Sequence, residues 1–154
     1  MDKSLFDLTG KVALITGSTK GIGKSMAEEL ARAGCKVVVS SRKVEACEAV
    51  RAEFEAKGFE VLAMPCNVSR KEDLQALVDA TRARWGSIDI AIANAAANPY
   101  YGALAQIPDE AFDKVFLNNV KSVLWLASMT LPEETEMAPP AGFQITECCS
   151  GTDW

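Results

Sequence analysis

The stretch "ITGSTKGIG", residues 15–23, decides the fold. It places Gly17, Gly21 and Gly23 between the apolar run "KVALIT" (11–16) and a helical segment. Gly17 permits a tight turn, and the two later glycines let the backbone approach a ligand and let the helix pack on the strand. Free N–H groups and the helix dipole at the start of such a helix attract a phosphate group. The sequence therefore predicts a strand, a phosphate-binding turn and a helix. The alternative is that the glycines only form a tight strand-to-helix turn.

Short apolar runs alternate with longer amphipathic segments along the rest of the chain, which is typical of a parallel sheet with helices on both faces. Ser69 and Glu72 have the spacing of a capping box at one helix start. Crossovers of this length are right-handed, so the chain is expected to wind outward from its first strand. The expected fold is a partial Rossmann-type, doubly wound α/β sheet with strand order 3-2-1-4. The expected strands are 11–16, 36–41, 59–66 and 88–94, and the expected helices are 21–33, 44–57, 69–85 and 108–131.

Two regions differ in pattern. Residues 1–131 are predicted to form an incomplete dinucleotide-binding domain. Residues 132–154 contain three prolines in 132–140 and show no periodicity, so this divergent tail is expected to be disordered or to form a poor fifth strand.

Composition excludes several functional classes. The chain has 154 residues, is 49% hydrophobic and carries a net charge of −5, which gives no general reason to bind nucleic acid or an anionic membrane. It contains no histidine, so no zinc site and no Ser-His-Asp triad is expected. No residue is predicted to bind a metal ion. Its five cysteines form no C-x-x-C pair and are interpreted as buried thiols. No apolar leader or membrane span is recognisable, so the expected location is the cytoplasm.

Four motifs together carry a family resemblance: "TGSTKGIG" (16–23), "CNV" (66–68), "ANAA" (93–96) and "LNNVKS" (117–122). With these motifs, residues 7–133 resemble the short-chain dehydrogenase/reductase family. The longer stretch "NAAANPYYG" (94–102), followed by "FDKVFLNNVKSVLWL" (112–126), is similar to its carbonyl-reductase-like members. The resemblance implies a nicotinamide cofactor and an oxidoreductase that reduces carbonyls or oxidises alcohols. The implied partner is a small-molecule carbonyl or alcohol substrate.

The residues after the second predicted strand indicate which nicotinamide cofactor is bound. An acidic residue there would bind the ribose 2′-hydroxyl of NAD, but "SSRK" (40–43) contains none. Arg42 and Lys20 are suited to a 2′-phosphate, with Ser41 as a neutral donor. The sequence therefore predicts NADP. The alternative is that both cations are solvated surface charges.

The resemblance also assigns individual cofactor contacts. Asn67 is expected to accept a hydrogen bond from the adenine amino group, or else to be a turn residue. Asn94, Ala95 and Ala96 are expected where the nicotinamide ribose passes over the strand ends. The full predicted set is Gly17, Ser18, Lys20, Gly21, Ile22, Gly23, Ser41, Arg42, Asn67, Val68, Asn94, Ala95 and Ala96.

The catalytic set implied by the family is incomplete. Members use a tyrosine, a lysine four residues later, a serine and an asparagine, and the asparagine falls on Asn119. Tyr100 and Tyr101 are the two tyrosines of the chain, and neither is followed by lysine at that spacing. An isolated tyrosine titrates near pH 10, so it is a poor proton donor without a nearby cation. The chain as written is expected to bind cofactor without turnover. The alternative function is a non-catalytic NADP-binding or interaction module, and a methyltransferase on a similar sheet is a weaker one.

The expected strand order has a further consequence. The strand within 88–94 would lie at an edge of the sheet, and the helix within 109–131 would expose apolar side chains. Self-association into a homo-oligomer is therefore expected.

Overall fold

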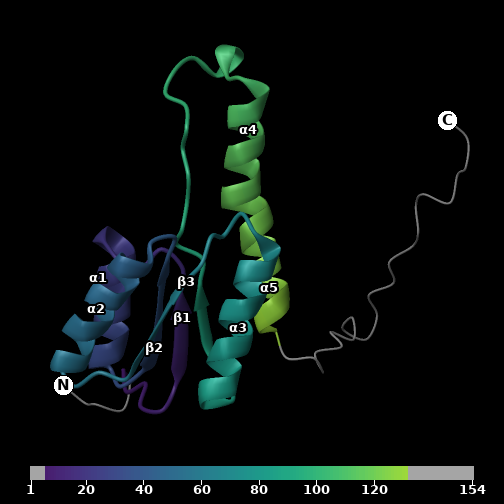
Figure 1. Ribbon diagram of the computed structural model, residues 1–154. Coiled ribbons are helices and arrows are strands. Elements are labelled where there is room, and N and C mark those ends of the chain that lie inside the picture. The colour runs from purple at the N-terminus through teal and green to yellow at the C-terminus, as the bar shows by residue number, and fades with distance from the viewer. Residues whose placement is uncertain (1–5, 132–154) are drawn as a thin grey trace, which may run out of the picture.

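Four parallel strands form the centre of the computed structural model, which describes residues 6–131 (Figure 1). Neighbouring strands follow the order β3-β2-β1-β4, and the predicted doubly wound α/β sheet is confirmed. The elements are β1 (Val12–Ile15), α1 (Gly21–Arg32), β2 (Lys36–Ser41), α2 (Val44–Ala56), β3 (Val61–Pro65), α3 (Lys71–Trp85), β4 (Ile90–Ile92), η1 (Leu104–Gln106), α4 (Asp109–Phe116), η2 (Leu117–Lys121) and α5 (Ser122–Thr130).

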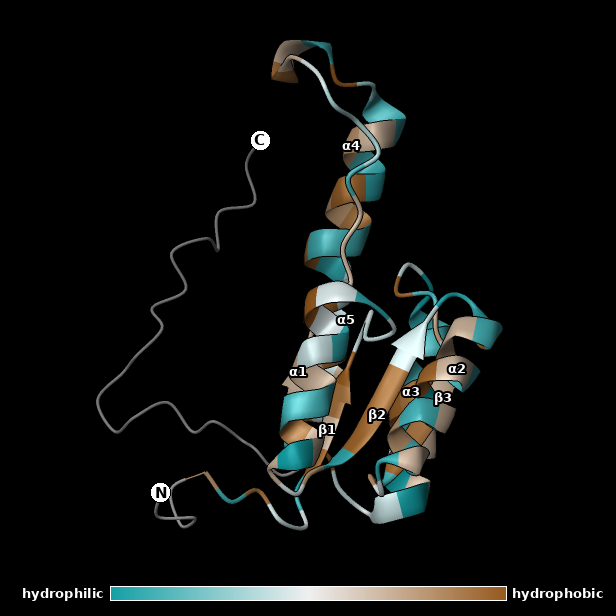
Figure 2. Ribbon diagram, turned by 90° about the vertical axis from the view of Figure 1, so that its left-hand side faces the viewer, coloured by the Kyte–Doolittle hydropathy of each residue, from teal (hydrophilic) through white to brown (hydrophobic). Residues whose placement is uncertain are grey.

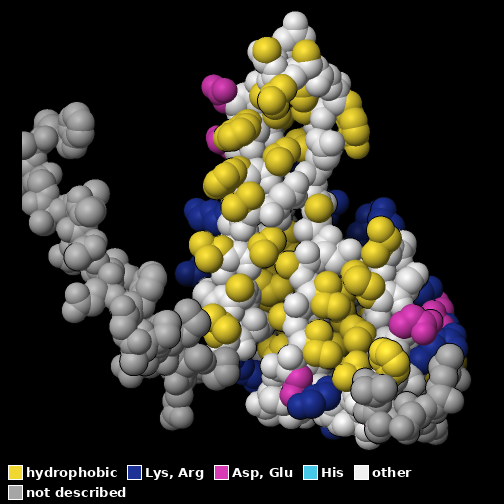
Figure 3. Space-filling view, turned by 180° about the vertical axis from the view of Figure 1, so that it is seen from behind, with side chains coloured by type: hydrophobic (Ala, Val, Ile, Leu, Met, Phe, Trp, Pro, Cys, Tyr) yellow, Lys and Arg dark blue, Asp and Glu magenta, His cyan; other side chains and the backbone are white. Residues whose placement is uncertain are grey.

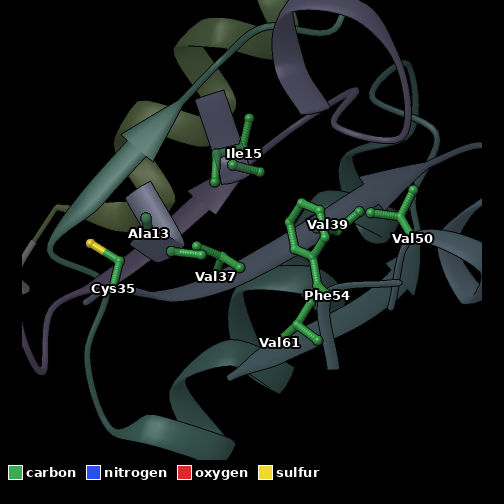
Figure 4. Close-up of a cluster of buried hydrophobic side chains, with 10 residues drawn as sticks. Ala13, Ile15, Cys35, Val37, Val39, Val50, Phe54 and Val61 are labelled. Atoms are coloured by element: carbon green, nitrogen blue, oxygen red, sulfur yellow. The ribbon is translucent and has the colours of Figure 1, made fainter. Parts of the chain in front are cut away.

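Helices cover both faces of the sheet because successive strand residues point to opposite sides. Figure 1 shows α1 and α2 on one side and α3 and α5 on the other. Ile15 packs with Phe54 of α2 in one buried cluster, whereas Leu14 packs with Leu74 and Leu126 in the second. The first cluster is drawn in Figure 4, and Figure 2 shows the apolar character of the central strands. The sheet is therefore a buried middle layer that fixes where its strand ends lie.

One side of the fold is open within the described residues. β4 pairs with β1 alone, as expected for an edge strand. Figure 1 shows that α4 projects beyond the sheet. Apolar side chains on α4 and α5 are exposed, including Phe112, Phe116 and Leu124. Figure 3 shows hydrophobic side chains along the surface of the projecting part. The prediction of an exposed apolar helix is thus confirmed for this part of the chain. Self-association stays a prediction.

Three sequence-based details need correction. The capping box at α3 is wrong: Arg70 is the N-cap residue without a side-chain cap, and the Ser69 hydroxyl donates instead to Asn67 Oδ1. The predicted helix 108–131 contains a π-helical segment, η2, between α4 and α5. The strand expected at 88–94 has ladder geometry at Ile90–Ile92 alone. The tail 132–154 lies outside the described residues, so the proposed boundary stays a prediction.

Candidate functional site

A pocket of roughly 480 Å³ lies at the carboxyl ends of all four strands. A doubly wound sheet places ligand sites at this edge, because the loops of neighbouring strands diverge there. The pocket is lined by every residue of the predicted cofactor set except Ser18, namely Gly17, Lys20, Gly21, Ile22, Gly23, Ser41, Arg42, Asn67, Val68, Asn94, Ala95 and Ala96. The structure thus brings together residues that are up to about 80 positions apart in the sequence.

The glycine loop turns sharply from β1 into α1. Gly17 and Gly21 have φ angles of +67° and +55°, a region that favours glycine. Gly17 also lies against the Ala95 backbone, so a Cβ at Gly17 would come within 3.0 Å of Ala95 Cα. The space above Gly21 is open, because a Cβ added there would meet no atom within 4 Å. The loop is therefore closed toward the sheet and open toward the pocket.

Ser18 lies beneath this loop and not in the pocket. Its side chain is fully buried, its hydroxyl donates to Ile15 O over 2.7 Å, and its Oγ accepts a hydrogen bond from Ser40 N. These bonds tie the loop to the end of β2. Ser18 therefore supports the loop from below, and Thr19 is the neighbouring residue that lines the pocket.

Thr16 and Asn94 join the loop to the end of β4. Asn94 Nδ2 donates to Thr16 O and Gly17 O over 3.1 and 3.0 Å. The Thr16 hydroxyl accepts hydrogen bonds from the backbone N–H groups of Asn94 and Ala95. Both side chains are committed to holding two strand ends together, and this fixes the shape of the pocket floor.

The start of α1 faces the pocket without a capping side chain. Its N-cap residue, Lys20, makes no side-chain cap hydrogen bond, and the first turn holds no acidic residue. Backbone N–H groups in a first helical turn have no intrahelical acceptor, and the helix dipole makes that end positive. Gly21, Ile22 and Gly23 line the pocket at this point. The arrangement has the chemistry of an anion cradle.

Two cations lie at the rim of the pocket. Lys20 and Arg42 line it, both residues are exposed, and neither forms an ion pair within residues 6–131. Ser41, beside Arg42, donates its hydroxyl to Lys43 O and accepts from Lys43 N in a local turn. Asp and Glu are missing from the pocket lining formed by the described residues, so the rim is positive although the chain as a whole is acidic.

Asn67 has the turn role that the sequence offered as an alternative. Its Oδ1 accepts hydrogen bonds from the backbone N–H and the hydroxyl of Ser69, which occupies both of its acceptor positions. Cys66 precedes it on the pocket wall, 4% exposed. Burial raises the pKa of the Cys66 thiol to about 12, which favours the protonated thiol over the thiolate at physiological pH.

Asn119 lies on η2 and holds the segment after β4. Its Oδ1 accepts from Ala97 N over 2.9 Å, and its Nδ2 donates to Ala97 O over 3.0 Å. Asn119 does not line the pocket, and its catalytic role stays a prediction. Tyr100 donates its hydroxyl to Ala103 O, and Tyr101 is 87% exposed. Neither tyrosine reaches the pocket lining.

Sequence reasoning missed four residues that line the pocket: Thr19, Cys66, Ala97 and Asn118. A signal existed for Thr19, because it lies within the glycine-rich stretch 15–23 that predicts the site. Asn118 gave no such signal, because the π-helical geometry of η2 alters which residues share a helix face.

Two other kinds of site are missing from residues 6–131. No helix there combines the length and the apolar character needed to cross a bilayer. No group of three or more cysteine, aspartate or glutamate side chains in that range is placed to hold a metal ion.

The sequence of this chain is similar to those of known proteins. The family model described as "short chain dehydrogenase" matches residues 11–147. "Dehydrogenase/reductase SDR family member 4" of Bos taurus is 40% identical over 126 residues, covering 82% of this chain and 45% of the relative. The chain therefore spans less than half the length of this curated relative.

Solved structures show the same likeness. A short-chain type dehydrogenase/reductase from Mycobacterium marinum superposes with a TM-score of 0.78 at 35% identity, covering 82% of this chain and 50% of the other. A metagenomic short-chain oxidoreductase in complex with NADP gives a TM-score of 0.75 at 30% identity, with coverages of 80% and 56%.

Proposed function

Because the chain belongs to the short-chain dehydrogenase/reductase family, whose members bind nicotinamide cofactors, we propose that its pocket binds NADP(H). Under this proposal, residues 1–131 are the cofactor-binding part of an oxidoreductase that acts on a carbonyl or a secondary alcohol. Bound NADP(H) supplies or accepts a hydride in such reactions. A location in the cytoplasm and a homo-oligomeric state stay predictions.

The positive rim of the pocket is the observation that favours NADP over NAD. Arg42 and Lys20 are exposed, unpaired within the described residues, and face a pocket that none of the described carboxylates lines. A 2′-phosphate between them would gain charge-assisted hydrogen bonds, and Arg42 can bind it through two N–H groups. The NADP complex of the metagenomic relative supports the same assignment.

The remaining pocket residues fit the other parts of a dinucleotide. The uncapped start of α1 and the open space above Gly21 suit a pyrophosphate. Ala95 and Ala96 are small enough to leave room above the end of β4 for the nicotinamide half. Asn94, with its amide committed to the glycine loop, positions the floor of this half and is not proposed to contact the cofactor through Nδ2.

Proton transfer to the substrate is not assigned to any residue of this chain. The sequence contains no tyrosine followed by lysine four residues later. Asn119 positions the Ala97 segment through two hydrogen bonds, which alone provides no proton donor. We therefore propose that residues 1–154 bind the cofactor as part of an oxidoreductase and do not turn over by themselves. The second candidate function is a non-catalytic NADP-binding or interaction module that is not part of an oxidoreductase.

Direct titration of the purified chain with NADPH and with NADH tests the proposal. We expect NADPH to bind more tightly, and Arg42→Ala to weaken NADPH binding by about 1.5–3 kcal/mol, or roughly ten- to a hundredfold in Kd, with little effect on NADH. Arg84→Ala is the matched control, because Arg84 stacks over Trp85 at the far end of α3. Equal or tighter binding of NADH would contradict the assignment.

A turnover assay tests the proposal that residues 1–154 bind the cofactor without turnover. NADPH oxidation is followed with a panel of ketones, and no rate above background is expected for the chain as written. A measurable rate that is lost in Asn119→Ala would overturn the non-catalytic proposal, because it would require a proton donor within these 154 residues.

A further inference from the structure

Asn118 is a buried polar residue that the proposed NADP contacts leave unused. It is 7% exposed, lies in η2 and lines the pocket at the strand ends. Buried amides are normally hydrogen-bonded through both their oxygen and their nitrogen. π-helical segments also occur frequently at functional sites. The hydrogen bonds that Asn118 makes within the protein therefore show which of its amide atoms is left to bind a ligand.

The orientation of the Asn118 amide is fixed chemically. Its Nδ2 is 2.7 Å from Lys114 O, a carbonyl oxygen that can only accept a hydrogen bond. The amide nitrogen must therefore face Lys114, and Oδ1 must face away from it. No residue in the described range donates to that Oδ1.

Asn118 Oδ1 is also reachable from the pocket. Among residues 6–131, no fully enclosed side-chain nitrogen or oxygen lacks a hydrogen-bond partner. An oxygen without a partner on Asn118 must then be accessible, and the pocket is the space that this residue lines. The structure thus presents one fixed acceptor, without a donor among the described residues, at the wall of the pocket.

The position of Asn118 favours the adenine end of the proposed cofactor. Asn118 lines the same pocket as Cys66 and Val68, which follow β3. Cys66, Asn67 and Val68 form the pocket wall at the end of β3. Asn67 was expected to accept the adenine amino group, but its oxygen is occupied by Ser69. Asn118 offers the acceptor that Asn67 lacks.

We propose that Asn118 Oδ1 accepts a hydrogen bond from the 6-amino group of adenine and so makes the pocket selective for that base. The inference rests on the proposed binding of NADP(H). A base with an oxygen at position 6 would place two acceptors against each other. The Asn118 amide cannot flip to relieve this repulsion between two acceptors, because its nitrogen is held by Lys114 O.

Isothermal titration of residues 1–154 with NADP and with its hypoxanthine analogue, which carries 6-oxo in place of 6-amino, tests the inference. We expect the wild type to prefer NADP by roughly three- to tenfold, the value of one neutral hydrogen bond. Asn118→Leu and Asn118→Ala should each reduce this preference to less than about twofold, mainly by weakening the binding of NADP. Asn98→Leu, a change in the loop after β4 outside the pocket lining, should leave the preference unchanged.

Each result has a defined meaning. Equal wild-type affinities for the two dinucleotides would overturn the role of Asn118 while leaving NADP binding in place. A preference that persists in both Asn118 variants would also overturn it, as would equal losses of affinity for both ligands, which indicate a structural role. Binding of neither dinucleotide by folded wild-type chain would overturn the proposed function as well. Melting curves of each variant establish that the folded state is being titrated.

Discussion

Gly23→Ala tests how the glycine loop is held against the sheet. Gly23 lies in the first turn of α1 and, unlike Gly17 and Gly21, does not have a positive φ angle. Its backbone conformation therefore suits alanine. A Cβ at this position would overlap Asn94 Nδ2 and the Gly17 carbonyl oxygen. The overlap with Gly17 involves backbone, so it cannot be relieved by a side-chain rotation alone.

One stabilising and two destabilising effects set the magnitude of this change. Replacing a helical glycine by alanine stabilises a protein by about 0.5–1 kcal/mol through backbone entropy. Displacing Asn94 would remove its bonds to Thr16 O and Gly17 O, each of which contributes about 0.5–1.5 kcal/mol. Overpacking adds about 1–3 kcal/mol of strain. We therefore expect Gly23→Ala to lower the free energy of unfolding by roughly 2–4 kcal/mol.

Urea unfolding followed by circular dichroism measures this difference. Ser25→Ala, an exposed change in the same helix, is the control and should stay within about 0.5 kcal/mol of the wild type. Asn94→Ala should cost about 1–3 kcal/mol, and the double variant should cost less than the sum because the two changes act on the same bonds. A Gly23→Ala variant as stable as the wild type would refute the close packing of loop and strand.

Three further outcomes follow from single side chains. Phe54→Ala should lower the free energy of unfolding by about 3–5 kcal/mol in urea titrations, because the Phe54 ring is fully buried edge-on against Phe59. Phe6→Ala is the control and should change the free energy of unfolding little, because the Phe6 side chain is 78% exposed. Similar effects of the two changes would contradict the assignment of Phe54 to the core. Lys11 and the Val12 N–H lower the pKa of Asp89, so its stabilisation is present at neutral pH and is lost as the pH falls through its folded-state pKa. The Asp89→Asn variant should therefore be less stable than the wild type near neutral pH and equally stable well below about pH 4. If the difference in stability between the two proteins did not depend on pH, a stabilising ion pair at Asp89 would be excluded. Cys66, whose pKa burial raises to about 12, should react with iodoacetamide far more slowly in the folded chain than in urea, and equal rates would show an accessible thiolate.

The sequence predicted the sheet well because its strands are nearly continuous apolar runs. β2 matches its expected range of 36–41, and each helix that ends at a glycine does so close to the expected residue. Gly34, Gly58 and Gly86 have positive φ angles after these helices, which is a local preference that a sequence displays directly. The pocket could be predicted for a related reason, since strand order alone brings the four strand ends together.

Polar side chains were less predictable because each has several possible partners nearby. Ser69 could either cap α3 or bond to Asn67. It forms the local turn, because Asn67 Oδ1 accepts hydrogen bonds from both the N–H and the hydroxyl of Ser69. Ser18 was expected in the pocket but lies below the loop, where Ile15 O and Ser40 N satisfy it. The position of Asn118 depends on a π-helical segment that the sequence pattern does not predict.

The spatial order of the strands in the sheet differs from the order in which they are synthesised. β1 lies between β2 and β4, yet the hydrogen bonds that join its end to the end of β4 connect residues 76–79 positions apart. At about 5–20 residues per second, a ribosome needs roughly 4–15 s to add that length of chain. During this time the central strand has one neighbour, and the glycine loop lacks the Asn94 bonds that fix it. The pocket floor can therefore form only after the end of β4 has left the ribosome. The glycine loop, which lines the same pocket, is synthesised much earlier, among the first residues of the chain.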